Sequence, residues 1–145
     1  MLAKLHQQLL EHGKDLGLLA IRLGIGGFFF YVHGLPKVQA GTELWLKLGG
    51  AMGNLGITFA PAAWGFLAAA AECGGGLLIL LGLLTRPAAA ALTFNMLVAT
   101  VMHLAMGDGL KGASHAAEAM FVFIGLAAAG AGRYSLDHLL FKGKF

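Results

Sequence analysis

The sequence predicts an all-α membrane protein, a bundle of four transmembrane helices with an interfacial or re-entrant helix in the first loop. The 145 residues are 58% hydrophobic and only 12% charged, with a mean hydropathy of +0.77. Soluble domains average roughly 25% charged residues. Four apolar segments approach the ~20 residues that a helix needs to cross a bilayer. Charged residues stand singly at the edges of these segments, where they can face lipid headgroups.

We expect the spans, in chain order, at residues 16–35, 62–84, 87–106 and 113–131 of a single domain that comprises residues 1–145. The breaks between the spans carry turn signals. Pro87 suits the first turn of a helix, so the segment before it separates the second span from the third. A glycine-rich loop covers residues 107–112, and Gly130 and Gly132 end the fourth span.

Two segments outside the spans are also expected to be helical. The leader has no A-x-A cleavage site, so we expect it to stay on the chain as a short amphipathic helix. Its apolar face carries Leu2, Leu5, Leu9 and Leu10. In the first loop, residues 43–59 are apolar but too short and glycine-rich to span comfortably. They favour the interfacial or re-entrant helix, with Trp45 at headgroup level.

The distribution of basic residues predicts the orientation. Four spans put both termini on one side of the membrane. That side carries Lys4, Lys14, Arg86, Arg133, Lys142 and Lys144, with Arg22 nearby, whereas the other carries Lys37, Lys47 and Lys111. The positive-inside rule therefore predicts cytoplasmic termini in a multi-pass protein, which we expect in the bacterial inner membrane.

Charge and cysteine content exclude several classes of protein. The net charge is +3 and the isoelectric point about 9.3, but no basic cluster is interleaved with aromatics, so a nucleic-acid partner is not expected. Cys73 is the single cysteine, which excludes an intrachain disulfide and a CxxC motif. Its place in an apolar run favours a small buried core residue.

Several ionisable residues fall inside the predicted spans, where such groups mark a functional site by default. At ~1.5 Å of rise per residue, His33, His103 and Glu118 reach one level in the outer third of the membrane. Glu72 lies about one helical turn lower. The spacing thus predicts a polar layer in one half of the bundle.

Helical periodicity assigns faces to these residues. One stripe of the first span carries Arg22, Gly26, Phe30, His33 and Lys37. Gly65, Ala68, Glu72 and Gly76 share a face of small residues on the second span. Small residues let helices approach closely, so Glu72 is expected to point toward a neighbouring helix.

The layer gives the candidate site residues. Glu72 and Glu118 are the candidate proton carriers, with a catalytic role. The candidate ligand-binding residues are His33, His103, Lys37, Arg22, Phe30 and Asn95. The alternative is a structural polar network that only locks the helices together, and this is the favoured interpretation for Arg22. For His115, one turn from Glu118, interfacial exposure is the favoured interpretation.

A quinone is the ligand that fits these residues best, because quinones dissolve in the bilayer and need a few donors in an apolar, aromatic pocket. Residues 28–31, three phenylalanines and a tyrosine beside His33, offer such a wall, although they could simply pack in the core or face lipid. A metal ion or a b-type haem between His33 and His103 is disfavoured, because no tight ligand motif such as HExxH is present.

Three motifs resemble the DoxX family of small four-span membrane proteins. They are RLGIGGFFFYVHGLPKV, AAAAECGGGLLILLGLLTRPAA and GAGRYSLDHLL. Within them Arg22, His33-Gly34, Lys37 and Glu72-x-Gly-Gly match the family pattern in order, as does Glu118 on the last span. The family takes its name from membrane subunits of a thiosulfate:quinone oxidoreductase. The resemblance therefore implies the fold and the membrane location, and points to redox chemistry.

The expected function is a small inner-membrane subunit or accessory of a quinone-linked redox system. An outer-leaflet pocket lined by His33, Glu72, His103 and Glu118 would bind a quinone or a similar apolar ligand. At most the chain is a membrane component of an oxidoreductase, with the bilayer and a protein partner or a second copy around it. Two alternatives stay open: a non-enzymatic anchor or assembly partner, and a small proton- or cation-coupled transporter. No internal repeat supports the transporter.

Overall fold

The computed structural model describes residues 2–141, and in its first helix the side chains of Leu10 and of residues from 12 onward. The predicted leucine face at Leu2, Leu5 and Leu9 and the basic residues Lys4, Lys142 and Lys144 lie outside the described side chains. Within the described part the chain is all-helical. It has four helices long and apolar enough to cross a membrane: His12–Gln39, Pro61–Leu81, Thr85–Ala105 and Gly109–Ala129. The predicted fold class is confirmed.

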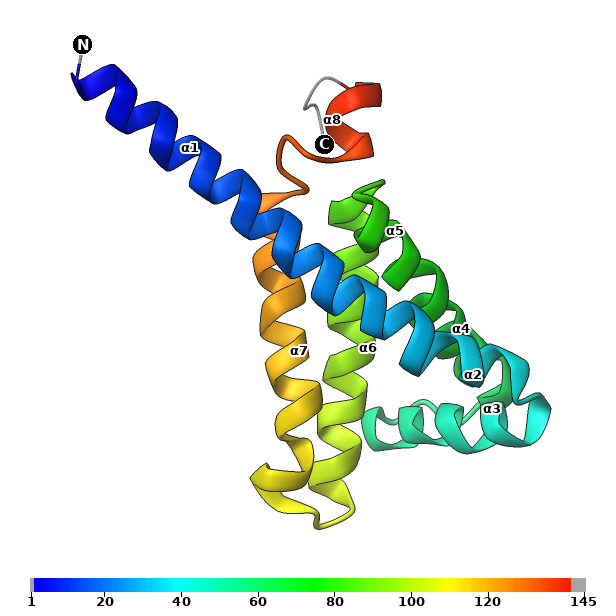
Figure 1. The fold of residues 1–145 in the computed structure, drawn as a ribbon. Coiled ribbons are helices and arrows are strands. Elements are labelled where there is room, and N and C mark those ends of the chain that lie inside the picture. The colour runs from blue at the N-terminus through cyan, green and yellow to red at the C-terminus, as the bar shows by residue number, and fades with distance from the viewer. Residues whose placement is uncertain (1, 142–145) are drawn as a thin grey trace.

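The bundle is built on an antiparallel pair, α6 (Thr85–Ala105) and α7 (Gly109–Ala129), which pack along their whole length. α1 (Leu2–Ile21) leads into the first span, which crosses the pair obliquely (Figure 1). The second span lies beside it and consists of α4 (Pro61–Ala70), a π-helical turn and α5 (Gly76–Leu81). Both termini lie at one end of the bundle, and the first loop lies at the other (Figure 1).

The first span is longer than predicted. From α1 the helix continues through the π-helical segments Arg22–Gly26 and Phe29–Gly34 into α2 (Leu35–Gln39). The leader is helical as expected, but it is continuous with the first span and so is not a short helix of its own. No proline interrupts residues 2–35, and an isolated glycine inside a helix costs only about 1 kcal/mol. The span also passes Pro36, which lies in the first turn of α2, just after the π-helical segment Phe29–Gly34.

The predicted helix in the first loop is present as α3 (Thr42–Gly49), followed by a 3₁₀ segment, Gly50–Leu55. It runs across the end of the bundle and packs against α4 (Figure 1). The two helices touch through backbone, since a Cβ on Gly65 would overlap the carbonyl of Trp45. We call residues 42–55 the lid.

The last two boundaries also differ from the prediction. α7 begins at Gly109, so residues 111 and 112, which were expected in a loop, lie inside its first turn. α6 begins at Thr85, two residues earlier than expected, because α8 (Leu136–Phe141) brings Asp137 against its start. The carboxylate accepts hydrogen bonds from the backbone N–H groups of Leu84 and Thr85, at 2.7 and 2.9 Å. This cap comes from a residue more than fifty positions away.

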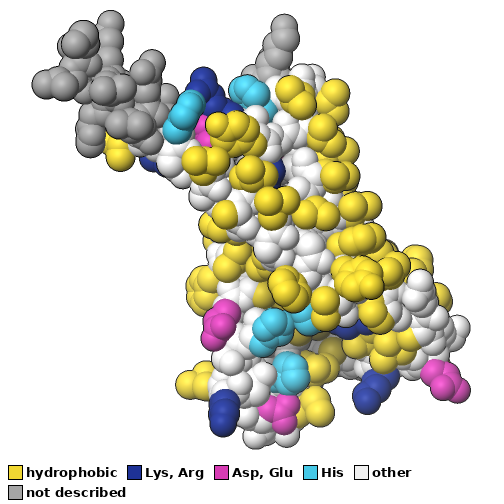
Figure 2. All heavy atoms as spheres, viewed as in Figure 1, with side chains coloured by type: hydrophobic (Ala, Val, Ile, Leu, Met, Phe, Trp, Pro, Cys, Tyr) yellow, Lys and Arg dark blue, Asp and Glu magenta, His cyan; other side chains and the backbone are white. Residues whose placement is uncertain are grey.

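The core sits between the first span, the second span and the α6–α7 pair. Its buried members include Phe29, Ile79, Leu92, Phe123 and Leu126. Figure 2 shows hydrophobic side chains over the middle of the molecule and most charged side chains toward its two ends. This distribution is the one expected when lipid surrounds the middle and water the ends.

Candidate functional site

The first and second spans cross in close backbone contact. A Cβ added to Gly34 would overlap the backbone of Cys73, and one on Gly76 would overlap the backbone of Phe30. Both helices are π-helical here, over Phe29–Gly34 and Ala71–Gly75. Such wide turns re-aim side chains and are frequent at functional sites. The crossing brings Glu72 of the second span next to Lys37, which lies one turn beyond His33 on the first span.

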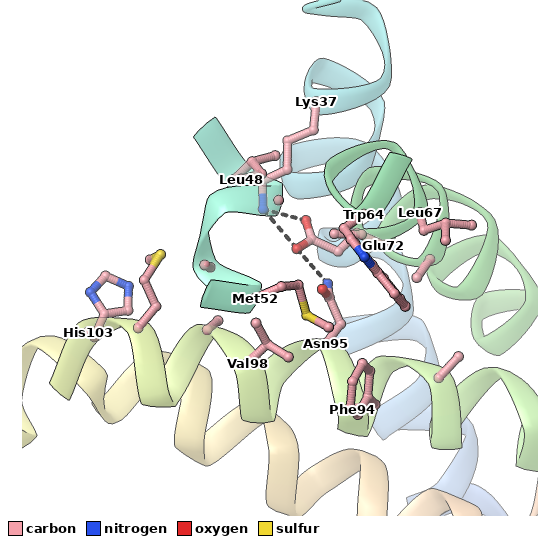
Figure 3. A pocket seen from close by; sticks show the side chains of 17 residues that line it. Lys37, Leu48, Met52, Trp64, Leu67, Glu72, Phe94, Asn95, Val98 and His103 are labelled. Atoms are coloured by element: carbon pink, nitrogen blue, oxygen red, sulfur yellow. Dashed lines mark hydrogen bonds and ion pairs between the residues drawn. The ribbon is translucent and has the colours of Figure 1, made fainter. Parts of the chain in front are cut away.

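Glu72 is the centre of a three-residue polar cluster. Lys37 donates from Nζ to both carboxylate oxygens, at 2.8 and 2.6 Å. Asn95 of α6 donates from Nδ2 to Oε1 at 3.0 Å. The three residues come from the first, second and third spans, so this cluster joins three helices. Figure 3 shows Lys37 and Asn95 converging on Glu72 from opposite sides.

The two charges of the pair differ in burial. The side chain of Glu72 is 4% exposed, whereas that of Lys37 is 29% exposed. A buried carboxylate is costly unless it is paired and hydrogen-bonded, and here it receives three hydrogen bonds. Lys37 thus pairs with a carboxylate that is almost fully buried, while part of its own surface stays exposed.

This cluster borders a cavity of about 550 Å³ between the lid, α4 and α6. Its volume falls within the ~300–1,000 Å³ of small-molecule sites. The wall is mostly apolar, with large side chains such as Met52, Trp64, Leu67, Phe94 and Val98. The cavity has the composition of a site for an apolar molecule that carries a few polar atoms.

The lid closes one side of the cavity and is tied to the cluster. Trp45 donates from Nε1 to the backbone carbonyl of Lys37, at 2.8 Å, and its ring packs edge-on against Phe66. Met52 at the other end of the lid is buried against Val98. The indole of Trp45 is therefore a structural tie between the lid and the polar cluster, in addition to any contact with headgroups.

His103 lies at the far end of the same cavity from Glu72 (Figure 3). Its Nδ1 is 2.8 Å from Oδ2 of Asp108, and both side chains are more than a third exposed. The carboxylate of Asp108 accepts a hydrogen bond from Nδ1 and so orients the ring. His103 can therefore present its other ring nitrogen to a molecule in the cavity.

The single polar layer expected from the sequence is divided by the structure. Glu72 and His103 line the cavity under the lid. His33 and Glu118 line a second hollow of about 310 Å³ between the first span and α7, together with His115. The prediction of one pocket for all four residues is wrong. The levels differ, because His103 lies two residues before the end of α6, whereas Glu118 lies nine residues after the start of α7. Depth along a helix also says nothing about the direction of a side chain. The side to which it points follows from the helix packing, which places these pairs on different sides of the first span.

The remaining candidates lie elsewhere. Arg22 is 1% exposed and donates to the carbonyls of Ala131 and Tyr134, at 2.8 and 2.6 Å, which fits the structural interpretation. Phe30 packs at the helix crossing and lines neither hollow. Of the expected aromatic wall, Phe28 borders the second hollow, whereas Tyr31 is 70% exposed on the outer surface. Cys73 was expected to be a buried core residue, but it is only half-buried at the crossing.

Among the described residues, no group of three histidine, cysteine or acidic side chains is placed to hold a metal ion. His33 and His103, the pair weighed and disfavoured as haem ligands, face different hollows.

Two features could not be foreseen from the sequence. The first is the set of lid residues that complete the cavity, Met52 above all, and the second is Asp108 as the partner of His103. Glycines on both of the helices that meet here carried a usable signal. Gly49 of the lid and Gly65 of α4 each sit where a Cβ would overlap the opposing helix, and small residues predict such close contacts.

Comparisons with known proteins agree with the motifs. The DoxX family model matches residues 17–105, a segment that includes Lys37, Glu72, Asn95 and His103. A protein from Bacillus subtilis (strain 168) described as "Putative oxidoreductase CatD" is 30% identical over 130 residues, which cover 90% of this chain and 91% of the relative. No solved structure matches the chain. The resemblance is confirmed, and the chain belongs to the DoxX family.

Proposed function

We propose that this membrane protein is a subunit or accessory of a quinone-linked redox system, and that a quinone or a similar apolar ligand binds in the cavity under the lid. One observation carries the proposal: an apolar cavity of about 550 Å³ has the Lys37–Glu72–Asn95 cluster at one end and His103 at the other. The relative described as an oxidoreductase supports the redox assignment.

The lining fits the chemistry of a quinone. A quinone ring has two carbonyl oxygens on opposite sides, and both accept hydrogen bonds. The Asn95 amide and the Lys37 ammonium each have a donor beyond those used on Glu72. At the other end, His103 presents its second ring nitrogen, which can accept a hydrogen bond from a quinol hydroxyl. Phe94 and Trp64 supply flat apolar surface between the two ends. An isoprenoid tail would lie against the apolar wall.

Glu72 and Lys37 have the right character for moving protons. Reduction of a quinone to a quinol takes two electrons and two protons. Lys37 reaches from the carboxylate toward the outside, so a proton can pass between water and the buried pair without opening the bundle. The electrons would come from a partner protein, and this chain would hold the quinone and handle its protons. Glu118 lies in the other hollow and has no part in this scheme.

We further propose that the termini face the cytoplasm of a bacterium. Lys14, Arg86 and Arg133 belong to the end of the bundle that carries both termini (Figure 1), and the positive-inside rule assigns that end to the cytoplasm. Cysteines introduced at Leu110 and Leu139, in a chain with Cys73→Ala, test this in intact cells. An impermeant maleimide should label the first and spare the second. The reverse pattern would overturn the orientation.

Binding of a short-tailed quinone tests the proposed function directly. The purified protein in lipid nanodiscs is titrated with the quinone, and quenching of tryptophan fluorescence reports binding because Trp64 borders the cavity. Ala68→Leu fills the cavity and should weaken binding by about tenfold or more. Glu72→Gln removes a charge that positions the donors and should weaken it by roughly three- to tenfold, the effect of about 1 kcal/mol of polar interaction.

Ala90→Leu is the matched control, since it makes the same change on the exposed face of α6 outside the cavity. It should bind the quinone as tightly as the unmodified protein. Failure of the folded, unmodified protein to bind any quinone, or unchanged binding by Ala68→Leu, would overturn the proposal and favour the non-enzymatic assembly partner.

A further inference from the structure

The second hollow exposes a carboxylate at membrane depth. Glu118 lies about 14 Å from the start of α7 at ~1.5 Å per residue, close to the middle of the span. Its side chain is exposed, and it takes part in none of the ion pairs or hydrogen bonds of the described residues. A charged group in this position is costly when it faces lipid.

The surroundings of Glu118 form a shallow groove between the first span and α7. His33 and His115 lie in this groove with their rings 5.4 Å apart, and Phe28, Ile25 and Val122 supply apolar sides. Its volume is about 310 Å³, and Gly24 on one wall leaves space that no neighbouring atom fills. A groove with apolar sides and a carboxylate with two imidazoles along it fits a helix better than a lipid chain.

Charge decides which helix fits. A second copy of the chain would bring its own Glu118 and histidines to the groove. The cations inside its described spans, Arg22 and Lys37, are already bound to internal partners. Its other described basic residues stand at the ends of the spans or in the lid, away from the level of Glu118. A self-contact would therefore place two carboxylates together with imidazoles as their partners, whereas a lysine or arginine of another helix brings a full positive charge to Glu118.

We propose that the groove around Glu118 docks a transmembrane helix of another protein that carries a lysine or arginine near the middle of its span. An ion pair at that depth removes the charge of Glu118 from lipid, and the histidines add hydrogen bonds to the partner. This interface lies on the other side of the first span from the cavity, so it can be tested separately from the quinone site.

Synthetic transmembrane peptides test the interface. A polyleucine-alanine host peptide with one central lysine is compared with peptides that carry glutamine or leucine at the same position. Binding to the labelled, full-length protein in liposomes is followed by energy transfer. The lysine peptide should bind roughly three- to tenfold more tightly than the glutamine peptide, the range of polar contacts between membrane helices. Glu118→Gln should abolish that preference.

Two further measurements keep the result specific. Glu43→Gln changes an exposed carboxylate on the lid and should leave the preference for lysine intact. Helix content and elution of Glu118→Gln should match those of the unmodified protein, because the side chain is exposed. Equal binding of the three peptides would overturn the proposal, as would Glu118-dependent association of the protein with itself in the absence of peptide. Quinone binding should be the same with and without the peptide, so each proposal can fail alone.

Discussion

The two ends of the bundle each bury charge, but they do so in different ways. At the end with the termini, Arg22 and Asp137 are 1% and 2% exposed, and the partners of both are backbone groups. At the lid end, Glu72 is 3% exposed and its partners are two side chains beside an apolar cavity. Charged side chains that bond to backbone groups fix the path of the chain and are structural. A charged side chain that bonds only to other side chains beside a cavity can lose or gain a proton or a partner while the backbone stays in place.

The largest effect is expected at the terminal end, for Asp137→Ala. The change leaves the N–H groups of Leu84 and Thr85 without an acceptor and removes the countercharge within electrostatic reach of Arg22. Breaking a buried charged network costs about 3–5 kcal/mol of unfolding free energy. Unfolding in mild detergent, followed by circular dichroism, measures it. A melting temperature equal to that of the unmodified protein would show that the cap does not hold the tail.

At the lid end, removing the cation should lower the unfolding free energy more than removing the carboxylate. Lys37→Met leaves a carboxylate that is 4% exposed without its countercharge, and should cost about 2–4 kcal/mol of unfolding free energy. Glu72→Gln leaves a lysine that is 29% exposed and can turn toward water, and should cost about 1 kcal/mol. The same unfolding assay compares the two.

The double variant Lys37→Met/Glu72→Gln controls for lost packing. It should recover most of the loss caused by Lys37→Met alone, since no unpaired charge remains. If Glu72→Gln proves as destabilising as Lys37→Met, the pair is as structural as the terminal network and the distinction between the two ends fails.

The fold class was predictable because lipid imposes a strong rule on sequence. Each span needs a long apolar run, which the sequence displays. The break after the fourth span was predicted from Gly130 and Gly132, and both glycines have a positive φ in the structure. The face of Glu72 was predictable for the same kind of reason, since Gly65 and Gly76 mark where the second span meets its neighbours.

The partners of the charges were less predictable. Arg22, Lys37, Glu72 and Glu118 were all candidate residues in the sequence, but periodicity gives only the direction of a side chain around its own helix. Which cation meets which carboxylate depends on how the helices cross. The crossing at Gly34 places Lys37 beside Glu72, so the two form an ion pair. The chain after α7 folds back, so that Asp137 accepts hydrogen bonds at the start of α6. Long-range contacts of this kind leave no local pattern in the sequence.

The smallest change in unfolding free energy is expected in the terminal network, the buried polar groups around Arg22 and Asp137 that include Thr85 and Ser135. Its hydroxyl at Thr85 is fully buried and has no hydrogen-bond partner among the described residues, whereas Ser135 donates to the carbonyl of Gly132 and accepts from the N–H of His138. A buried polar group without a partner costs roughly 1–3 kcal/mol. Thr85→Val keeps the branched shape and removes that hydroxyl, so it should stabilise the protein by up to about 1 kcal/mol.

Ser135→Ala is the matched change at a bonded hydroxyl and should destabilise by about 1 kcal/mol in the same unfolding assay. Opposite signs for the two variants would mean that the terminal network is held by its backbone-directed bonds and merely tolerates the hydroxyl of Thr85. Equal losses would mean that Thr85 is bonded in the folded protein. The cap on α6 would then consist of the Asp137 carboxylate and this hydroxyl together, and its strength could not be assigned to the carboxylate alone.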